Sequence, residues 1–172
     1  YMPLLAIRTI REKTLTATTK LEGQDRVLVY GCQPGIDLTG LAQKGVGVLT
    51  LPCVAALTPS FIDFVITRHH ADGVMLVGCA AGDCYHRLGV DWTEQRLAGQ
   101  RDPYLRGRVP RERIATAWVA PSGAKRLTQA LDAFRSRLRD MGPYQKGGSL
   151  PPPSASPSSN HGEVSDAAYR LG

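Results

Sequence analysis

The sequence predicts an α/β fold: a small parallel sheet of about four strands with flanking helices, followed by an extended low-complexity C-terminal tail. Short aliphatic runs recur along the chain, and apolar residues fill consecutive positions in them, as is typical of strands covered on both faces. Segments that can form helices separate the runs. An alternation of strands and helices gives right-handed crossovers and hence a parallel sheet.

The two ends of the chain differ in composition from its centre. Residues 1–24 are interpreted as an N-terminal arm or linker, in which TIREKTLTATTKLEG suits a short polar helix or an irregular arm. Residues 143–172 are rich in proline and serine and cannot form a core. We expect this tail to wrap a partner protein. Residues 25–142 are then the α/β domain, which is expected to hold the functional site.

The predicted strands and helices follow one another in order. Thr58 is a plausible N-cap for the second helix, with Pro59 at the favoured first helical position, and Gly142 marks the end of the last helix. The strand segments are DRVLVYGC (25–32), VGVLTLPC (46–53), ADGVMLVGC (71–79) and ERIATAWVAPSG (112–123). The segments that can be helical are IDLTGLAQKG (36–45), TPSFIDFVITRHHADG (58–73) and GAKRLTQALDAFRSRLRDMGP (123–143).

The formal net charge of +6 comes mostly from arginine. We expect the arginine-rich segment to be a solvated face with local ion pairs to Glu94, Asp102 and Glu112, and an assembly surface. No recognised nucleic-acid-binding module or regular aromatic interleaving accompanies the charge, so no nucleic-acid partner is expected. The arginines concerned are Arg96, Arg101, Arg106, Arg108, Arg111 and Arg113.

No stretch reaches the roughly 18 uninterrupted apolar residues of a membrane span, and the first residues lack the order of a signal peptide. We therefore expect no membrane span in this chain. The expected location is the cytoplasm, including the cytoplasmic face of the membrane if a membrane complex binds the protein.

Four cysteines are the main chemical feature: Cys32, Cys53, Cys79 and Cys84. The first three follow their predicted strands by at most one residue. Because the carboxyl ends of parallel strands lie along one edge, where open α/β sheets bind ligands, their sulfurs should meet there. Cys84 can turn back to the same place, since Gly82 permits a tight loop.

The cysteine spacing favours an iron–sulfur cluster over zinc. Structural zinc sites prefer C-x2-C pairs, which are absent, whereas the C-x4-C spacing of Cys79 and Cys84 occurs in 2Fe-2S proteins. Two other interpretations stay open: buried cysteines without a ligand, and a dithiol reductase, although its usual C-x-x-C motif is missing. Candidates to stabilise an anionic cluster are the backbone amides of Gly31, Gly78 and Gly82 and the cation of Arg87.

These segments resemble a known family. VLVYGC, LPC and DGVMLVGCAAGDCYHRLG, followed by a WTEQRL helix, a strand and a helix, are similar to the delta subunit of methyl-viologen-reducing hydrogenases, the hydrogenase iron-sulfur subunit family. The resemblance covers about residues 25–141. It implies an α/β domain whose 2Fe-2S cluster relays electrons between a hydrogenase or other donor and a heterodisulfide-reductase-like flavoprotein, and by matching positions it implies Cys32, Cys53, Cys79 and Cys84 as ligands.

The sequence departs from the family at one position. Members usually carry C-x2-C at the end of the first strand, whereas this chain has CQPG, with Gly35 in place of the second cysteine. Four thiols still suffice for one 2Fe-2S cluster.

The expected function is electron transfer: the chain is expected to be one component, not a self-contained enzyme, that relays single electrons within a multi-subunit oxidoreductase complex. Its expected partners are redox subunits carrying iron–sulfur clusters, flavin or haem, including a membrane cytochrome. The alternative is a zinc-bound or metal-free structural module that helps to assemble a larger complex.

Overall fold

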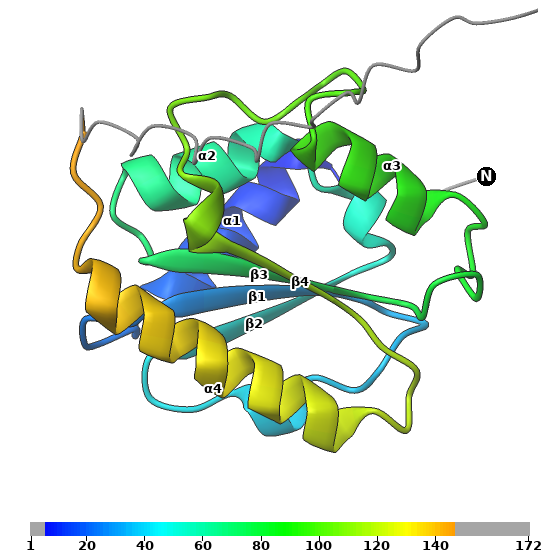
Figure 1. Cartoon of the computed structure of the whole chain (residues 1–172), viewed down its shortest axis with the longest axis horizontal. Helices are drawn as coiled ribbons and strands as arrows, with labels where there is room; N and C mark the ends of the chain where they lie inside the picture. Colours follow the sequence, from blue (N-terminus) through cyan, green and yellow to red (C-terminus); the bar gives the residue numbers. More distant parts are fainter. Residues whose placement is uncertain (1–5, 147–172) are drawn as a thin grey trace, which may run out of the picture.

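The computed structural model describes residues 6–146 and contains one sheet of four strands, β1 (Val27–Cys32), β2 (Val46–Leu51), β3 (Gly73–Gly78) and β4 (Ile114–Trp118). All neighbouring strands run parallel, in the order β2-β1-β3-β4, so β1 and β3 are central (Figure 1). The register places Val27 between Val46 and Gly73. The predicted parallel sheet is confirmed.

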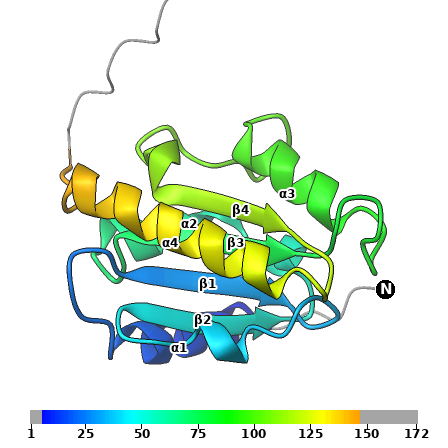
Figure 2. The same ribbon diagram turned by 60° about the horizontal axis from the view of Figure 1, so that its bottom comes forward.

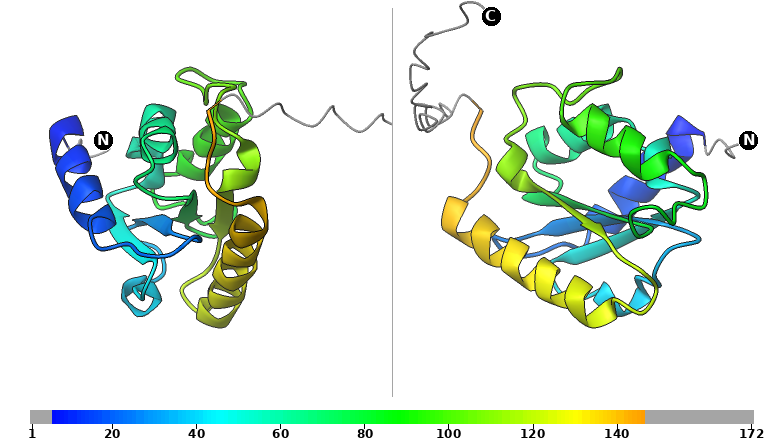
Figure 3. Two further views of the ribbon diagram at one scale, coloured as in Figure 1. Left: turned by 90° about the vertical axis from the view of Figure 1, so that its left-hand side faces the viewer. Right: turned by 45° about the vertical axis from the view of Figure 1, so that its right-hand side comes forward.

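Helices cover both faces of this sheet. The α-helices are α1 (Ile7–Thr18), α2 (Pro59–Thr67), α3 (Gly89–Leu97) and α4 (Ala124–Met141), and single turns of 3-10 helix are η1 (Thr39–Leu41), η2 (Val54–Ala56) and η3 (Arg111–Arg113). Figure 2 shows α4 lying across one face of the sheet. Figure 3 shows the sheet edge-on, with α1 and α2 on the face opposite α4.

Each central strand supplies side chains to two separate cores. Leu28 and Tyr30 pack with α1 and α2, while Val27 and Val29 pack with α4, and all four are fully buried. Because successive strand residues point to opposite faces, a sheet covered on both sides needs apolar residues at every position. This arrangement explains the uninterrupted apolar runs in the sequence.

Residues 36–45 form less helix than predicted. Only the η1 turn is helical, because Gly40 is a poor helix former and Gly45 adopts a positive φ of 79° that ends the segment before β2. Asp37 shapes this loop by accepting a hydrogen bond from the Thr39 amide at 2.9 Å. Ile36, Leu38 and Leu41 are buried beside α4, so this connection lies on the α4 face.

The predicted boundaries of two other helices are confirmed. The α2 helix begins at Pro59, although the Thr58 hydroxyl hydrogen-bonds the Ser60 hydroxyl at 2.7 Å and caps no backbone amide. The α4 helix ends at Met141, and Gly142 follows with a positive φ of 69°.

The residues outside the sheet on its amino-terminal side include a packed helix. Ile10 of α1 is 1% exposed, and the Thr14 and Tyr30 hydroxyls form a buried hydrogen bond of 2.8 Å. Tyr144, just after α4, is also buried. The predicted tail that wraps a partner lies mostly in residues 147–172, outside the described residues.

No helix within residues 6–146 is both long enough and apolar enough to cross a membrane.

Candidate metal centre at the carboxyl edge of the sheet

The four cysteines lie at the carboxyl-terminal edge of the sheet. Cys32 ends β1, Cys53 follows β2, Cys79 directly follows β3, and Cys84 lies on the loop between β3 and α3. The chain leaves β1 toward the α4 face and leaves β3 toward the opposite face, where α3 packs. A crevice between two adjacent strands whose connections diverge in this way is where open α/β sheets bind ligands.

The structure brings the sulfurs together. Cys32, Cys53 and Cys79 are 4%, 1% and 7% exposed and belong to one buried cluster with Val54 and Ala55. The Cys53 thiol is hydrogen-bonded to Cys32 and to Cys84, and Cys79 is close enough to Cys32 to interact electrostatically. None of the four forms a disulfide. The thiols are therefore free to bind a metal centre, and Cys84, which is half-buried, lies nearest to solvent.

Two of the thiols have strongly shifted pKa values. The hydrogen bond from Cys32 is the main cause that lowers the pKa of Cys53 to about 6, helped by the Ala55 amide, the charge of His86 and the Cys84 thiol, and opposed by burial. The same hydrogen bond, followed by burial, raises the pKa of Cys32. One thiolate thus already exists in the site near neutral pH, which favours metal binding because metals bind the deprotonated form.

Backbone groups supply positive potential to the sulfurs. The Val54 amide of η2 donates a hydrogen bond to Cys32 Sγ at 3.3 Å. The first residue of α3, Gly89, is in contact with two sulfurs, since a Cβ there would lie 2.6 Å from Cys53 Sγ and 3.2 Å from Cys84 Sγ. The amino-terminal end of a helix carries a partial positive charge, which stabilises nearby anions.

Trp118 closes the site on the β4 side. Its ring packs against the cysteine cluster and across Gly78, where a Cβ would lie 2.6 Å from the ring. The indole Nε1 donates a hydrogen bond of 2.6 Å to the Glu94 carboxylate on α3. Sequence reasoning missed this residue, although an aromatic side chain at the carboxyl end of the fourth predicted strand was a signal for it.

The other sequence-predicted site residues occupy different positions around the cysteines. Gly31 and Gly78 lie within strands, and a Cβ on either would collide with Leu38 or Trp118, so close packing requires both glycines. Gly82 has a positive φ of 85° on the exposed loop before Cys84, as the predicted tight loop requires. Arg87 lies on the same loop with an exposed side chain.

The arginine-rich segment is not the solvated face that the sequence predicted. Within residues 6–146 its arginines form no ion pair with Glu94, Asp102 or Glu112. Arg108 instead binds the buried Asp63 carboxylate at 2.9 Å, and Arg113 donates to two backbone carbonyls. Buried acceptors need such partners, and these acceptors are far away in sequence, so local spacing could not identify them.

The geometry of the cysteine edge does not suit a single ion. Within the described part of the chain, no three His, Cys, Asp or Glu side chains are placed to hold one metal ion together. The sulfurs instead contact one another as neighbours along the sheet edge, Cys84 beside Cys53, Cys53 beside Cys32, and Cys79 near Cys32.

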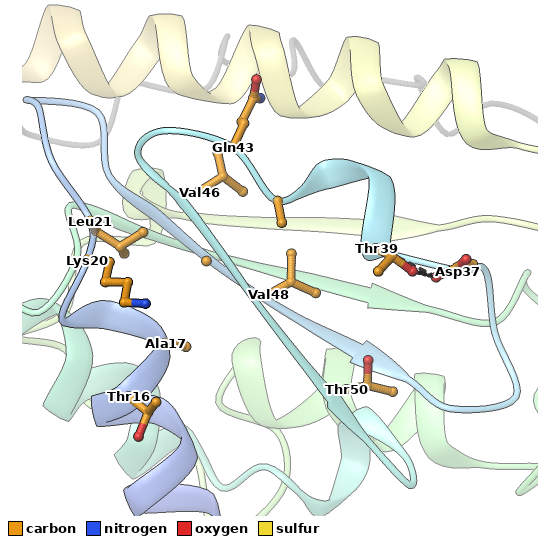
Figure 4. A pocket seen from close by; sticks show the side chains of 12 residues that line it. Thr16, Ala17, Lys20, Leu21, Asp37, Thr39, Gln43, Val46, Val48 and Thr50 are labelled. Atoms are coloured by element: carbon orange, nitrogen blue, oxygen red, sulfur yellow. Dashed lines mark hydrogen bonds between the residues drawn. The ribbon is translucent and has the colours of Figure 1, made fainter.

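A separate groove of about 530 Å³ follows the outer edge of β2, between α1 and the loop before β2 (Figure 4). Its charged lining residues are Lys20 and Asp37, and hydrogen bonds from the Thr39 hydroxyl and amide hold the pKa of Asp37 below its usual value. Among the described residues, no cysteine or histidine lines this groove, so it lacks the ligands found at the cysteine edge.

Known redox proteins are similar to this chain. Residues 36–142 match the family described as methyl-viologen-reducing hydrogenase, delta subunit; this range contains three of the four cysteines and begins after Cys32. The chain is 27% identical over 100 residues to an F420-non-reducing hydrogenase iron-sulfur subunit of Archaeoglobus profundus, covering 58% of this chain and 72% of that protein. It is 25% identical over 113 residues to the F420-non-reducing hydrogenase vhc iron-sulfur subunit of Methanococcus voltae, covering 63% and 78%.

A larger protein contains a similar segment. It belongs to the ferredoxin/F(420)H(2)-dependent CoB-CoM heterodisulfide reductase of Methanosarcina acetivorans and is 24% identical over 118 residues, which is 66% of this chain but 14% of that protein. Similar sequence thus occurs both in short proteins and within a long polypeptide. Since the family match spans more than half of the chain and follows the observed order of strands and helices, the protein belongs to the methyl-viologen-reducing hydrogenase delta subunit family.

Proposed function

We propose that the protein is an electron-transfer subunit of a multi-subunit oxidoreductase complex, and that Cys32, Cys53, Cys79 and Cys84 hold a 2Fe-2S cluster. One observation carries the proposal: three buried, unlinked thiols from three strand ends lie together at one sheet edge, with Cys84 beside Cys53. The iron-sulfur names of the hydrogenase relatives support it.

The donor set suits a centre with two irons. A 2Fe-2S cluster takes four cysteines, two on each iron, so it needs two pairs of sulfurs and not a trio around one ion. The four thiols are unlinked and lie along one edge, in keeping with that demand. Such a cluster supplies one-electron oxidation and reduction. The cysteine missing at Gly35 is not needed for this count.

The surrounding residues would control the potential of the centre. Val54, Ala55 and the Trp118 ring exclude water from the buried sulfurs, while the Val54 amide and the amino-terminal end of α3 favour negative charge there. Hydrogen bonds to cluster sulfurs and solvent exclusion are two main determinants of iron–sulfur potentials.

The loop between β3 and α3 is the proposed side of electron exchange. Cys84 is the most exposed of the cysteines, and the adjacent Tyr85 and Leu88 are 73% and 48% exposed. Exposed apolar side chains beside a redox centre suit contact with another redox protein. Candidate partners carry iron–sulfur clusters, flavin or haem, including a membrane cytochrome, and the hydrogenase and heterodisulfide reductase names of the relatives favour this class.

The proposal is tested by anaerobic purification, iron and acid-labile sulfide analysis, and EPR spectroscopy of the reduced protein. We expect about two irons and two sulfides per chain and a signal that appears on one-electron reduction. About one equivalent of zinc without visible charge-transfer absorption would instead support the zinc-bound structural module, and absence of any metal would support the metal-free one.

A matched pair of variants locates the centre. C79S should lose the cluster absorption and the EPR signal, because it removes a proposed ligand. A71S is the control, since it places a hydroxyl at another buried position just before the opposite end of the same strand, where Ala71 is 1% exposed. Equal cluster content in the two variants would exclude Cys79 as a ligand.

A further inference from the structure

The α3 helix makes a second contact with the cysteine edge, through Arg96. Gly89, Thr93 and Arg96 are spaced to lie on one face of α3. Gly89 is in contact with the Cys53 and Cys84 sulfurs, and two turns later the Arg96 Nη1 donates a hydrogen bond of 2.9 Å to the Ala55 carbonyl of η2. This face of α3 therefore holds both the sulfurs and the turn beside them.

The hydrogen bonds of η2 show what this contact does. The Ala56 and Leu57 amides close the turn on the Cys53 and Val54 carbonyls, both at 3.0 Å. The Val54 amide, at the start of the turn, is left to donate to Cys32 Sγ, and the Ala55 amide faces Cys53. The Ala55 carbonyl, at the other end, is left to accept from Arg96. The turn is thus held between the sulfurs and a guanidinium.

Arg96 itself is incompletely partnered. Its Nε is the one buried side-chain nitrogen or oxygen in residues 6–146 that has no hydrogen-bond partner, and within the same residues Arg96 forms no ion pair. Buried donors are almost always paired in folded proteins, and buried charges are paired as well. A half-buried arginine without a carboxylate, beside a set of thiols, indicates a site that is complete only when it carries negative charge.

We infer that Arg96 is a positioning residue of the cysteine site: it fixes the Ala55 carbonyl so that the η2 amides stay directed at the Cys32 and Cys53 sulfurs, and it adds positive charge beside the anionic centre. The inference rests on the proposed function where it concerns a cluster, and on the hydrogen bonds of η2 where it concerns the protein alone. Both effects favour the reduced, more negative state of a cluster and raise its potential.

The experiment compares the R96Q variant with the R106Q variant by EPR-monitored redox titration of the full chain. Arg106 is the matched control, because its side chain is exposed and makes no hydrogen bond or ion pair within the described part of the chain. R96Q should shift the midpoint potential of the cluster to a more negative value while R106Q keeps the wild-type value. R96K, which retains a charged donor of similar reach, should move the potential back toward wild type.

Hydrogen exchange of the metal-free protein separates this inference from the proposed function. The Val54 and Ala55 amides should exchange several-fold faster in R96Q than in R106Q, whether or not any cluster is ever bound. A wild-type sample that binds no iron, with this exchange difference present, would refute the proposed function and leave the positioning role of Arg96 standing.

Two results would overturn the inference. One is a cluster-loaded R96Q protein with the wild-type potential, or with wild-type exchange of the two amides. The other is loss of folding in both R96Q and R96K, since Arg96 would then be a packing residue of the fold and not a positioning residue of the site.

Discussion

The two ends of the sheet solve opposite problems. At the amino-terminal end, charged side chains are matched by partners of opposite charge or by backbone carbonyls. At the carboxyl-terminal end, thiols and backbone amides gather, and a half-buried arginine has no carboxylate within the described residues. The charged residues at the amino-terminal end are Asp25, Arg26, Asp72, Arg113, Arg135 and Arg139.

The amino-terminal end is closed by these contacts. The Asp72 carboxylate accepts hydrogen bonds from the Arg26 amide at 2.9 Å and from its guanidinium at 3.0 Å. The nearby Asp25 carboxylate pairs with Arg135 and Arg139 of α4, at 2.9 and 2.7 Å. These pairs attach α4 and β3 to the start of β1, and both carboxylates are occupied by them.

The difference teaches where the chain accepts an energetic cost. A fully paired network rigidifies a fold, whereas unpaired groups persist where they serve a function. Stability should therefore depend on the amino-terminal end and metal content on the carboxyl-terminal end. Substitutions at the two ends can test this division.

The largest expected effect on stability is that of D72A. Removing the buried carboxylate leaves the Arg26 amide and guanidinium without an acceptor, and breaking such a pair costs about 3 kcal/mol. The free energy of unfolding, from urea denaturation, should fall by about that amount. The iron content of the folded fraction should not change.

E12A is the control for D72A. Glu12 pairs with Arg8 on the surface of α1, where both side chains are more than half exposed. Exposed pairs of this kind contribute less than about 1 kcal/mol. A comparable loss of stability in E12A and D72A, or a loss of iron in D72A, would break the division between the two ends.

A smaller effect on stability, with a large effect on the site, is expected for G89A. The new Cβ would lie 2.6 Å from Cys53 Sγ, so the sulfurs or α3 must move. Overpacking of this kind costs about 1–3 kcal/mol, offset by the roughly 1 kcal/mol by which alanine favours a helix over glycine. The bound iron per chain should fall far more than stability does.

G107A is the matched control, because a Cβ at Gly107 would meet nothing within 4 Å. It should leave the iron content unchanged and stability equal or slightly higher, since alanine reduces the entropy of the unfolded chain. If G89A retains full iron content, the contact between α3 and the sulfurs does not matter for the centre.

The sequence sufficed for the features that depend on local pattern. Consecutive apolar residues predicted strands covered on both faces, and the parallel sheet then placed the cysteines at one edge. The starting residue of α2 followed from Pro59 and the end of α4 from Gly142, since each has a local backbone preference.

The features that sequence reasoning missed depend on contacts between distant segments. The amide donor to Cys32 comes from Val54, the arginine that holds η2 lies 41 residues after Ala55, and the glycines expected as donors instead make room for Leu38 and Trp118. Which carbonyl a long arginine side chain reaches is set by tertiary packing. The arginine-rich segment could therefore be counted from the sequence but not assigned partners.

The smallest expected effect is a pH dependence at the amino-terminal end. Burial lowers the pKa of His70, and the nearby charges of Arg26, Arg11 and Arg68 lower it further. The unfolded chain therefore binds a proton more readily than the folded protein, so stability from this residue is lost as pH falls through the ordinary histidine value of 6.5 toward the folded one. In H70Q, the free energy of unfolding should decline less than in wild type between about pH 7.5 and 5.5. The lowered pKa of Cys53 affects both metal-free proteins alike, so their difference isolates His70. Above about pH 8 the two curves should run parallel, because His70 is neutral there in both states. Equal slopes in the acidic range would mean that the cations around β3 do not act on His70, and that the amino-terminal end is electrostatically balanced at this position too.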